Sequence, residues 1–159
     1  MGKISEKSPL FRTKQVMLED LAFVLSQGNL RHGTKFAVLD QIIWVWSEFD
    51  GKHDGCRFWS NEALQSGSKR AGLIHEHLVP RNIIRSKIFA LEMPDMHSIK
   101  CILEGTCIGV VVTKTEDDRL REFKLNKAMP DGWDGKDVWA RYRKANIPVM
   151  DMRNKKGAY

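Results

Sequence analysis

The sequence has 159 residues, 42% of them hydrophobic and five of them tryptophan, a composition that excludes a wholly disordered chain. No apolar run reaches the length of a membrane span, and the polar, basic first residues lack the apolar core of a secretory signal, so we expect a cytoplasmic protein without a membrane partner. Three irregularly spaced cysteines argue against a disulfide framework, and the net charge of +6 favours a polyanionic partner.

The first half of the chain is predicted to be mainly helical. Thr13 is placed to cap a helix over residues 14–26, whose apolar residues recur at helical spacing. A second helix, over about residues 35–49, is apolar around most of its circumference, which favours a place in the core. Its aromatic rings can also stack on bases, although rings at helical spacing are more often packed inside.

Turns and short elements follow this second helix. Residues 50–55 hold Asp, His and Gly in a pattern that can bind a cation, but they lack the ligand order of a calcium loop, so a surface turn is predicted. Residues 56–59 are expected to be extended, and Ser60 opens a capped helical turn. The next loop contains Lys69 and Arg70, which suit either a phosphate clamp or an ordinary surface loop.

The richest group of metal- and proton-handling side chains is His75, Glu76 and His77, in a short apolar stretch before Pro80. Two imidazoles and a carboxylate can bind a divalent cation and leave one ring as a base near neutral pH. In a regular strand the two histidines share one face and Glu76 points the other way, so all three converge only if the strand ends or bulges. The alternative is one packed histidine, one exposed histidine, and Glu76 paired with a neighbour such as Arg81.

A basic amphipathic helix is predicted after the histidine stretch, over residues 82–91, and a short helix over residues 96–103. The cations of the first helix lie mostly away from its apolar face. They are Arg81, Arg85 and Lys87.

Residues 107–113 form an uninterrupted apolar run and are the best candidate for a buried strand. A helix is expected to begin directly afterwards, with Thr115 as its cap. Glu116, Asp117 and Asp118 then lie at the positive end of that helix. These acids either only stabilise the helix start, or one of them reaches across to a metal.

The five residues Glu76-His77-Leu78-Val79-Pro80, followed by an apolar strand and an acidic helix, resemble the start of an HNH or His-Me finger nuclease. The resemblance implies a small ββα unit that grips one divalent metal. It implies that His77 is the general base that activates water and that Glu76 is a metal ligand. The nearest counterpart of the family's middle asparagine, which orients the base, is Asn82.

The resemblance also implies a ligand set. Asp117 or Asp118 would take the second carboxylate position, and hard oxygen ligands favour magnesium or manganese. Adding His75 as a ligand would shift the preference toward zinc, nickel or cobalt.

Together these features predict a metal-dependent endonuclease that hydrolyses DNA. The alternative is a non-catalytic module that binds nucleic acid or protein on a degenerate nuclease-like fold, such as a phage or mobile-element inhibitor of host defence. The predicted nucleic-acid-binding residues are Lys69, Arg70, Arg81, Arg85 and Lys87.

The fold is predicted to be α+β, a mainly helical single domain with a small embedded ββα-like finger. We expect this domain over residues 14–150, between a flexible leader at residues 1–13 and a basic, frayed tail at residues 151–159. A short helix over residues 137–145 would close the domain.

Overall fold

The computed structural model describes residues 13–67 and 71–159. The helices are α1 (Lys14–Ser26), α2 (His32–Ser47), α3 (Asn61–Gln65), α4 (Arg81–Phe89), α5 (Met96–Thr106), α6 (Lys114–Glu122) and α7 (Ala140–Lys144). The strands are β1 (Phe58–Ser60), β2 (Leu73–His77), β3 (Gly109–Thr113), β4 (Val149–Asp151) and β5 (Lys156–Gly157). The predicted α+β class is confirmed.

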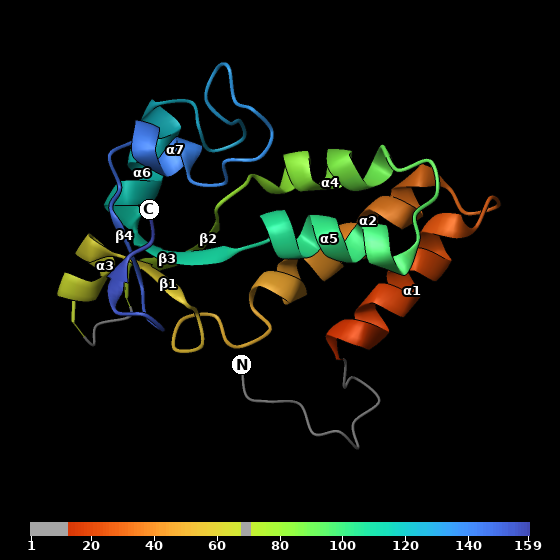
Figure 1. Ribbon diagram of the computed structural model, residues 1–159, viewed down its shortest axis with the longest axis horizontal. Helices are drawn as coiled ribbons and strands as arrows, with labels where there is room; N and C mark the ends of the chain where they lie inside the picture. The colour runs from red at the N-terminus through yellow and green to blue at the C-terminus, as the bar shows by residue number, and fades with distance from the viewer. Residues whose placement is uncertain (1–12, 68–70) are drawn as a thin grey trace.

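The chain separates into a helical end and a sheet end (Figure 1). Helices α1, α2, α4 and α5 lie together, while the sheet, α3, α6 and α7 lie at the other side. The predicted helix over residues 14–26 is confirmed, and the side chain of Thr13 caps it by accepting from the Val16 amide at 3.1 Å. The apolar faces of the four helices form one core. Its fully buried members include Leu21, Leu39, Ile43, Ile84, Ile99 and Leu103.

The sheet has the strand order β2-β3-β1-β4-β5. Strand β3 lies inside it, antiparallel to β2 and parallel to β1. Val110, Val111 and Val112 are fully buried, which explains why this strand is a continuous apolar run and not an alternating one. A second core, separate from that of the helical end, includes Leu120 and Tyr142.

A strand, strand, helix unit joins the two ends. Strands β2 and β3 pair antiparallel from Leu73 opposite Thr113 to His77 opposite Gly109, with α4 and α5 inserted between them. Helix α6 follows β3 without a gap. Its cap is Thr113 and not the predicted Thr115, because Thr113 has the extended backbone that a cap requires and forms a capping box with Glu116.

The C-terminal segment is ordered into strands, whereas the sequence predicted a frayed tail after residue 150. Asp151 in β4 accepts two hydrogen bonds from the guanidinium of Arg57, at 2.6 and 2.9 Å. The Tyr159 hydroxyl donates to the carbonyl of Ile147. Contacts with residues elsewhere in the chain therefore order the C-terminal segment, although its own composition is polar. The predicted leader over residues 1–13 lies outside the described residues, except for Thr13.

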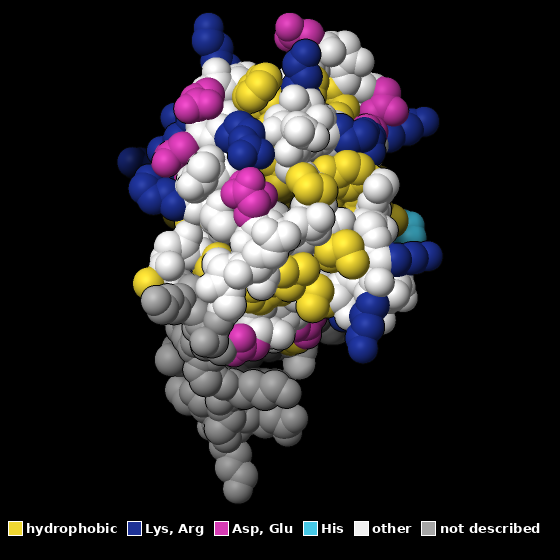
Figure 2. All heavy atoms as spheres, turned by 90° about the vertical axis from the view of Figure 1, so that its left-hand side faces the viewer, with side chains coloured by type: hydrophobic (Ala, Val, Ile, Leu, Met, Phe, Trp, Pro, Cys, Tyr) yellow, Lys and Arg dark blue, Asp and Glu magenta, His cyan; other side chains and the backbone are white. Residues whose placement is uncertain are grey.

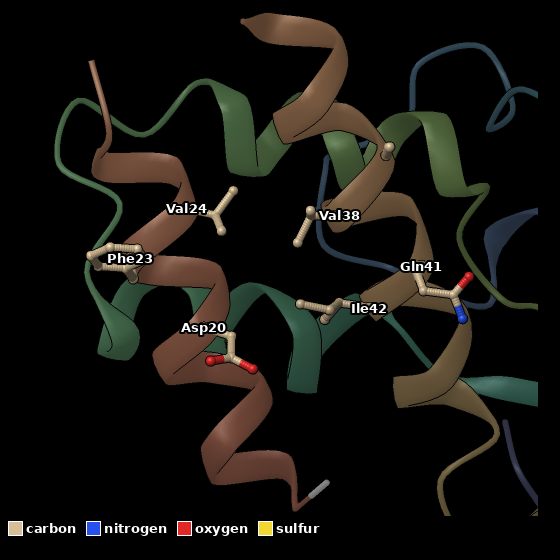
Figure 3. A pocket seen from close by; sticks show the side chains of 7 residues that line it. Asp20, Phe23, Val24, Val38, Gln41 and Ile42 are labelled. Atoms are coloured by element: carbon tan, nitrogen blue, oxygen red, sulfur yellow. The ribbon is translucent and has the colours of Figure 1, made fainter. Parts of the chain in front are cut away.

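None of the helices within residues 13–67 and 71–159 is both long enough and apolar enough to cross a bilayer. A shallow hollow of about 450 Å³ lies between α1 and α2 (Figure 3). It is lined by Asp20, Phe23, Val24, Ala37, Val38, Gln41 and Ile42. This mostly apolar lining contains one carboxylate, so the hollow lacks the paired acid and base of a hydrolytic centre.

Candidate functional site

The end of β2 places its polar side chains on two opposite faces, as strand alternation predicts. His75 and His77 point toward α2, where both rings lie near the ring of Trp44, at centroid distances of 6.5 and 5.6 Å. Glu76 points the other way and contacts Arg141 of α7. The strand continues regularly to His77, so the three side chains do not converge.

His77 is a buried, neutral ring. Its side chain is 2% exposed, and its Nε2 atom has no hydrogen-bond partner among the described residues. Burial is the main reason that the pKa of His77 is lowered to about 3, and electrostatic interactions with His75 and Arg81 contribute to the same shift. A ring with this pKa is a weak proton acceptor, which is the opposite of what a general base needs.

His75 is held by two groups, one at the last residue of α2 and one in the turn that follows it. Its Nδ1 atom lies 2.7 Å from the carbonyl oxygen of Lys52, and its Nε2 atom lies 3.3 Å from the hydroxyl of Ser47. Because a carbonyl only accepts, the proton of the neutral ring sits on Nδ1. Burial is also the main reason that the pKa of His75 is lowered. Both ring nitrogens therefore have structural partners.

Glu76 is held by a fully buried arginine. Its Oε1 atom accepts from Nη2 of Arg141 at 2.5 Å, and its Oε2 atom accepts from the His77 amide at 2.9 Å. Arg141 also donates to the carbonyls of Leu78 and Leu125, each at 2.8 Å, and to that of His77. The guanidinium thereby ties the end of β2 to α7 and to the segment after α6.

The acidic residues of α6 lie near the start of the helix and have hydrogen-bond or ion-pair partners within the fold. Glu116 is fully buried and accepts from the Thr113 amide at 2.9 Å and from the Ser60 hydroxyl at 2.5 Å. Asp117 is buried and forms an ion pair with Arg121 at 2.7 Å, while the more exposed Asp118 pairs with Lys114 at 3.2 Å.

Strand β2, which carries Glu76, nevertheless contacts α6, which carries Asp117. Tyr142 is fully buried, and its pKa is raised mainly by burial, lowered by the charge of Arg141, and raised further by the charges of Glu76, Glu116 and Asp117. Its hydroxyl has no hydrogen-bond partner in the described chain. The structure thus places the elements that carry Glu76 and Asp117 in contact and leaves His75 and His77 on the other side of β2.

The predicted cations of α4 make internal contacts. Arg81 and Arg85 both pair with Asp40, the first at 3.1 Å, and they lie over the rings of Trp44 and Phe36. Lys87 lies over the ring of Trp133 and donates to the carbonyl of Gly135.

The remaining predicted binding and catalytic residues are Asn82, Lys69 and Arg70. The side chain of Asn82 donates to the carbonyl of Lys127 at 2.9 Å. Lys69 and Arg70 lie outside the described residues.

Within residues 13–67 and 71–159, no group of three or more histidines, cysteines or carboxylates is arranged to hold a metal ion. Burial raises the pKa of Cys56 to about 11 and that of Cys107 to about 12, so both thiols stay protonated at neutral pH. The magnesium, manganese, zinc or nickel ion that the resemblance implies remains a prediction.

A group that sequence reasoning missed lies at the sheet end. Three aromatic rings contact one another in a row: Phe58 and Trp139 at a centroid distance of 5.2 Å, and Trp139 and Tyr159 also at 5.2 Å. Arg57 lies over the Phe58 ring at 4.8 Å, and Arg143 lies over the Tyr159 ring at 5.3 Å. We call these five residues the aromatic ladder. These residues come from three separate segments of the chain. The only local sign of the ladder in the sequence is that Trp, Tyr and Arg lie close together in residues 139–143.

The left-hand side of Figure 1, which carries α3, α6 and β4, faces the viewer in Figure 2. Apolar side chains gather in the middle of this face, with Lys, Arg and several acidic side chains around them. Comparison with known proteins finds no matching family model, no matching curated protein and no matching solved structure.

Proposed function

We propose that this chain is a non-catalytic nucleic-acid-binding module, in which β2, β3 and α6 are a scaffold. The observation that carries the proposal is the distribution of charge along the sequence. Residues 1–118 contain fifteen Lys and Arg and fifteen Asp and Glu, whereas residues 119–159 contain eleven and five. The whole net charge of +6 therefore belongs to the C-terminal part of the chain.

The cations of this C-terminal part are mostly at the surface. Several lie in or beside α7 and the β4–β5 hairpin, and we call them the basic hairpin surface. They are Lys144, Arg153, Lys155 and Lys156, all exposed. Clustered exposed cations attract the phosphate backbone of any nucleic acid, because binding releases condensed counterions.

The groups that cutting would need have other roles in the fold. Glu76 neutralises the buried Arg141, and Asp117 pairs with Arg121. His77 is neutral and faces Trp44, away from Glu76. Each contact supports a structural role for the stretch that resembles a nuclease motif.

Fluorescence anisotropy with a labelled DNA oligonucleotide tests the proposal. We expect binding whose affinity falls steeply with salt, and a loss of about tenfold when Lys155 and Lys156 are both replaced by glutamate. The matched control is Lys100→Glu, an exposed lysine of α5 at the helical end. The proposal fails if no binding appears at low salt, or if both variants weaken binding equally.

A metal-dependent DNA endonuclease is the second candidate, favoured by one observation. The elements β2, β3 and α6 follow one another as strand, strand and helix, and β2 and α6, which carry Glu76 and Asp117, contact each other. Two carboxylates in one neighbourhood suit a hard divalent cation. For cutting, Glu76 would have to exchange Arg141 for the metal, and the His77 ring would have to leave its place beside Trp44.

Cleavage assays separate the two candidates. Plasmid DNA and single-stranded RNA are incubated with magnesium, manganese, zinc or chelator, and wild type is compared with Glu76→Gln and His77→Ala after circular dichroism shows that each is folded. Metal-dependent cutting that both substitutions abolish would replace the first proposal with the second. Binding without cutting under every condition supports the binding module.

A further inference from the structure

We infer that the nucleic acid bound by this chain is single-stranded, and that its bases stack on the aromatic ladder while the basic hairpin surface holds its backbone. This inference rests on the proposed nucleic-acid binding and adds the class of ligand. It starts from the position of the ladder, which lies beside α7 and the β4–β5 hairpin, where Lys144, Arg153, Lys155 and Lys156 are exposed.

The outer end of the ladder is open to solvent. Tyr159 is 45% exposed, and the side chain of Arg143, which lies over its ring, is 47% exposed. The Tyr159 hydroxyl donates to the carbonyl of Ile147, so the ring is held in one orientation. A base can stack on an oriented aromatic ring or on the flat face of a guanidinium with little loss of side-chain freedom.

The two arginines of the ladder offer flat guanidinium faces for stacking, whereas their charges are already paired with carboxylates. Arg57 is neutralised by Asp151 through two hydrogen bonds, and Arg143 is paired with Asp137. Phosphate attraction must therefore come from the neighbouring cations of the basic hairpin surface. This division of work, with stacking by one set of side chains and charge from another, is the pattern of proteins that bind single strands.

A duplex fits this arrangement poorly. Its bases are stacked on one another, so their flat faces are closed to protein side chains, and it offers the ladder only phosphates and groove edges. A single strand offers both flat base faces and phosphates. The ladder therefore favours single strands, whereas the cations alone would bind either form.

The experiment measures the affinity of the full chain for labelled oligothymidine, oligouridine and a DNA duplex, each about 20 nucleotides long and at one salt concentration. We expect each single strand to bind at least about tenfold more tightly than the duplex. The DNA and RNA arms report which sugar the surface prefers.

Two substitutions then isolate stacking from charge. Tyr159→Ala should weaken single-strand binding by about tenfold and leave duplex binding unchanged, while Tyr159→Phe, which keeps the ring, should retain most of the affinity. Arg143→Lys keeps the charge but loses the plane, and it should weaken single-strand binding several-fold. The control is Phe23→Ala, an exposed aromatic residue on α1 at the helical end.

The outcomes are distinct. Equal affinity for single strands and duplex, with Tyr159→Ala and Arg143→Lys both silent, overturns the ladder as a binding site and leaves the proposed function standing. Absence of binding to every oligonucleotide overturns both. If Tyr159→Ala lowers the melting temperature, Arg143→Lys decides, because that side chain is half exposed at the surface.

Discussion

The two faces of β2 handle polar side chains in opposite ways. On one face, Glu76 forms an ion pair with the buried guanidinium of Arg141. On the other face, His75 and His77 are kept neutral by burial beside Trp44. Consecutive residues that look like one catalytic group in the sequence therefore belong to two different environments.

The difference teaches how a short motif can mislead. A carboxylate next to a histidine suggests an acid and a base that act together, but strand alternation turns them to opposite sides of a sheet. Glu76 has an ion-pair partner in Arg141, whereas burial lowers the pKa of His77 and keeps its ring neutral. Each face can be disturbed separately, which makes the comparison testable.

The largest effect is expected from breaking the charged face. Arg141→Ala leaves Glu76 and the carbonyls of Leu78 and Leu125 without their donor in a buried place. Removing one partner of a buried ion pair typically costs about 3–5 kcal/mol, so we expect a loss of this size in the free energy of unfolding. Urea denaturation at pH 7 measures it.

The matched control for this substitution is Arg143→Ala, two residues along the chain. Arg143 pairs with Asp137 at the surface, and exposed pairs contribute only about 0–1 kcal/mol. If the two variants lost equal stability, Arg141 would not be the anchor of the charged face.

A smaller effect is expected from crowding the histidine face. A Cβ atom at Gly109 would lie 2.3 Å from Cε1 and 2.4 Å from Nε2 of His75. Gly109→Ala therefore forces the His75 ring away from Lys52 and Ser47. Overpacking of this kind typically costs about 1–3 kcal/mol, which urea denaturation resolves.

Rescue tests the cause of that loss. The double variant Gly109→Ala with His75→Ala removes the ring that the new methyl group meets, so it should be more stable than the sum of the two single losses predicts. Simple additivity would mean that the clash with His75 is not the source of the cost.

Much of the fold could be predicted, because its elements depend on local patterns. The apolar spacing of residues 14–26 and the run of valines in β3 both lead to the observed elements. The hairpin of β4 and β5 could not be predicted. The hairpin is held by the ion pair of Arg57 with Asp151 and by the hydrogen bond from Tyr159 to Ile147. No local sequence pattern indicates that these residues are partners.

The candidate site follows the same rule. Alternation correctly predicted that His75 and His77 share one face and that Glu76 lies on the other. The partner of Glu76 is Arg141, 65 residues away, and not the neighbouring Arg81, which pairs with Asp40. No local pattern encodes that choice, because several arginines compete for each carboxylate and packing decides among them.

The smallest change in the free energy of unfolding is expected for a change of one pH unit. It tests whether burial keeps the His77 ring neutral. His77 has a pKa of about 3 in the folded chain, against about 6.5 when unfolded, so between these values only the unfolded state binds the proton. Stability is therefore full above about pH 6.5 and falls as the pH is lowered, by up to about 1.4 kcal/mol per pH unit. Urea denaturation at pH 7, 6 and 5 should show this slope in wild type and a flatter one in His77→Gln, which cannot titrate. His75, whose pKa is also lowered, should leave a remaining slope in that variant. Parallel slopes in the two proteins would mean that folding leaves the pKa of His77 unchanged, and burial would then not be what keeps the histidine face neutral.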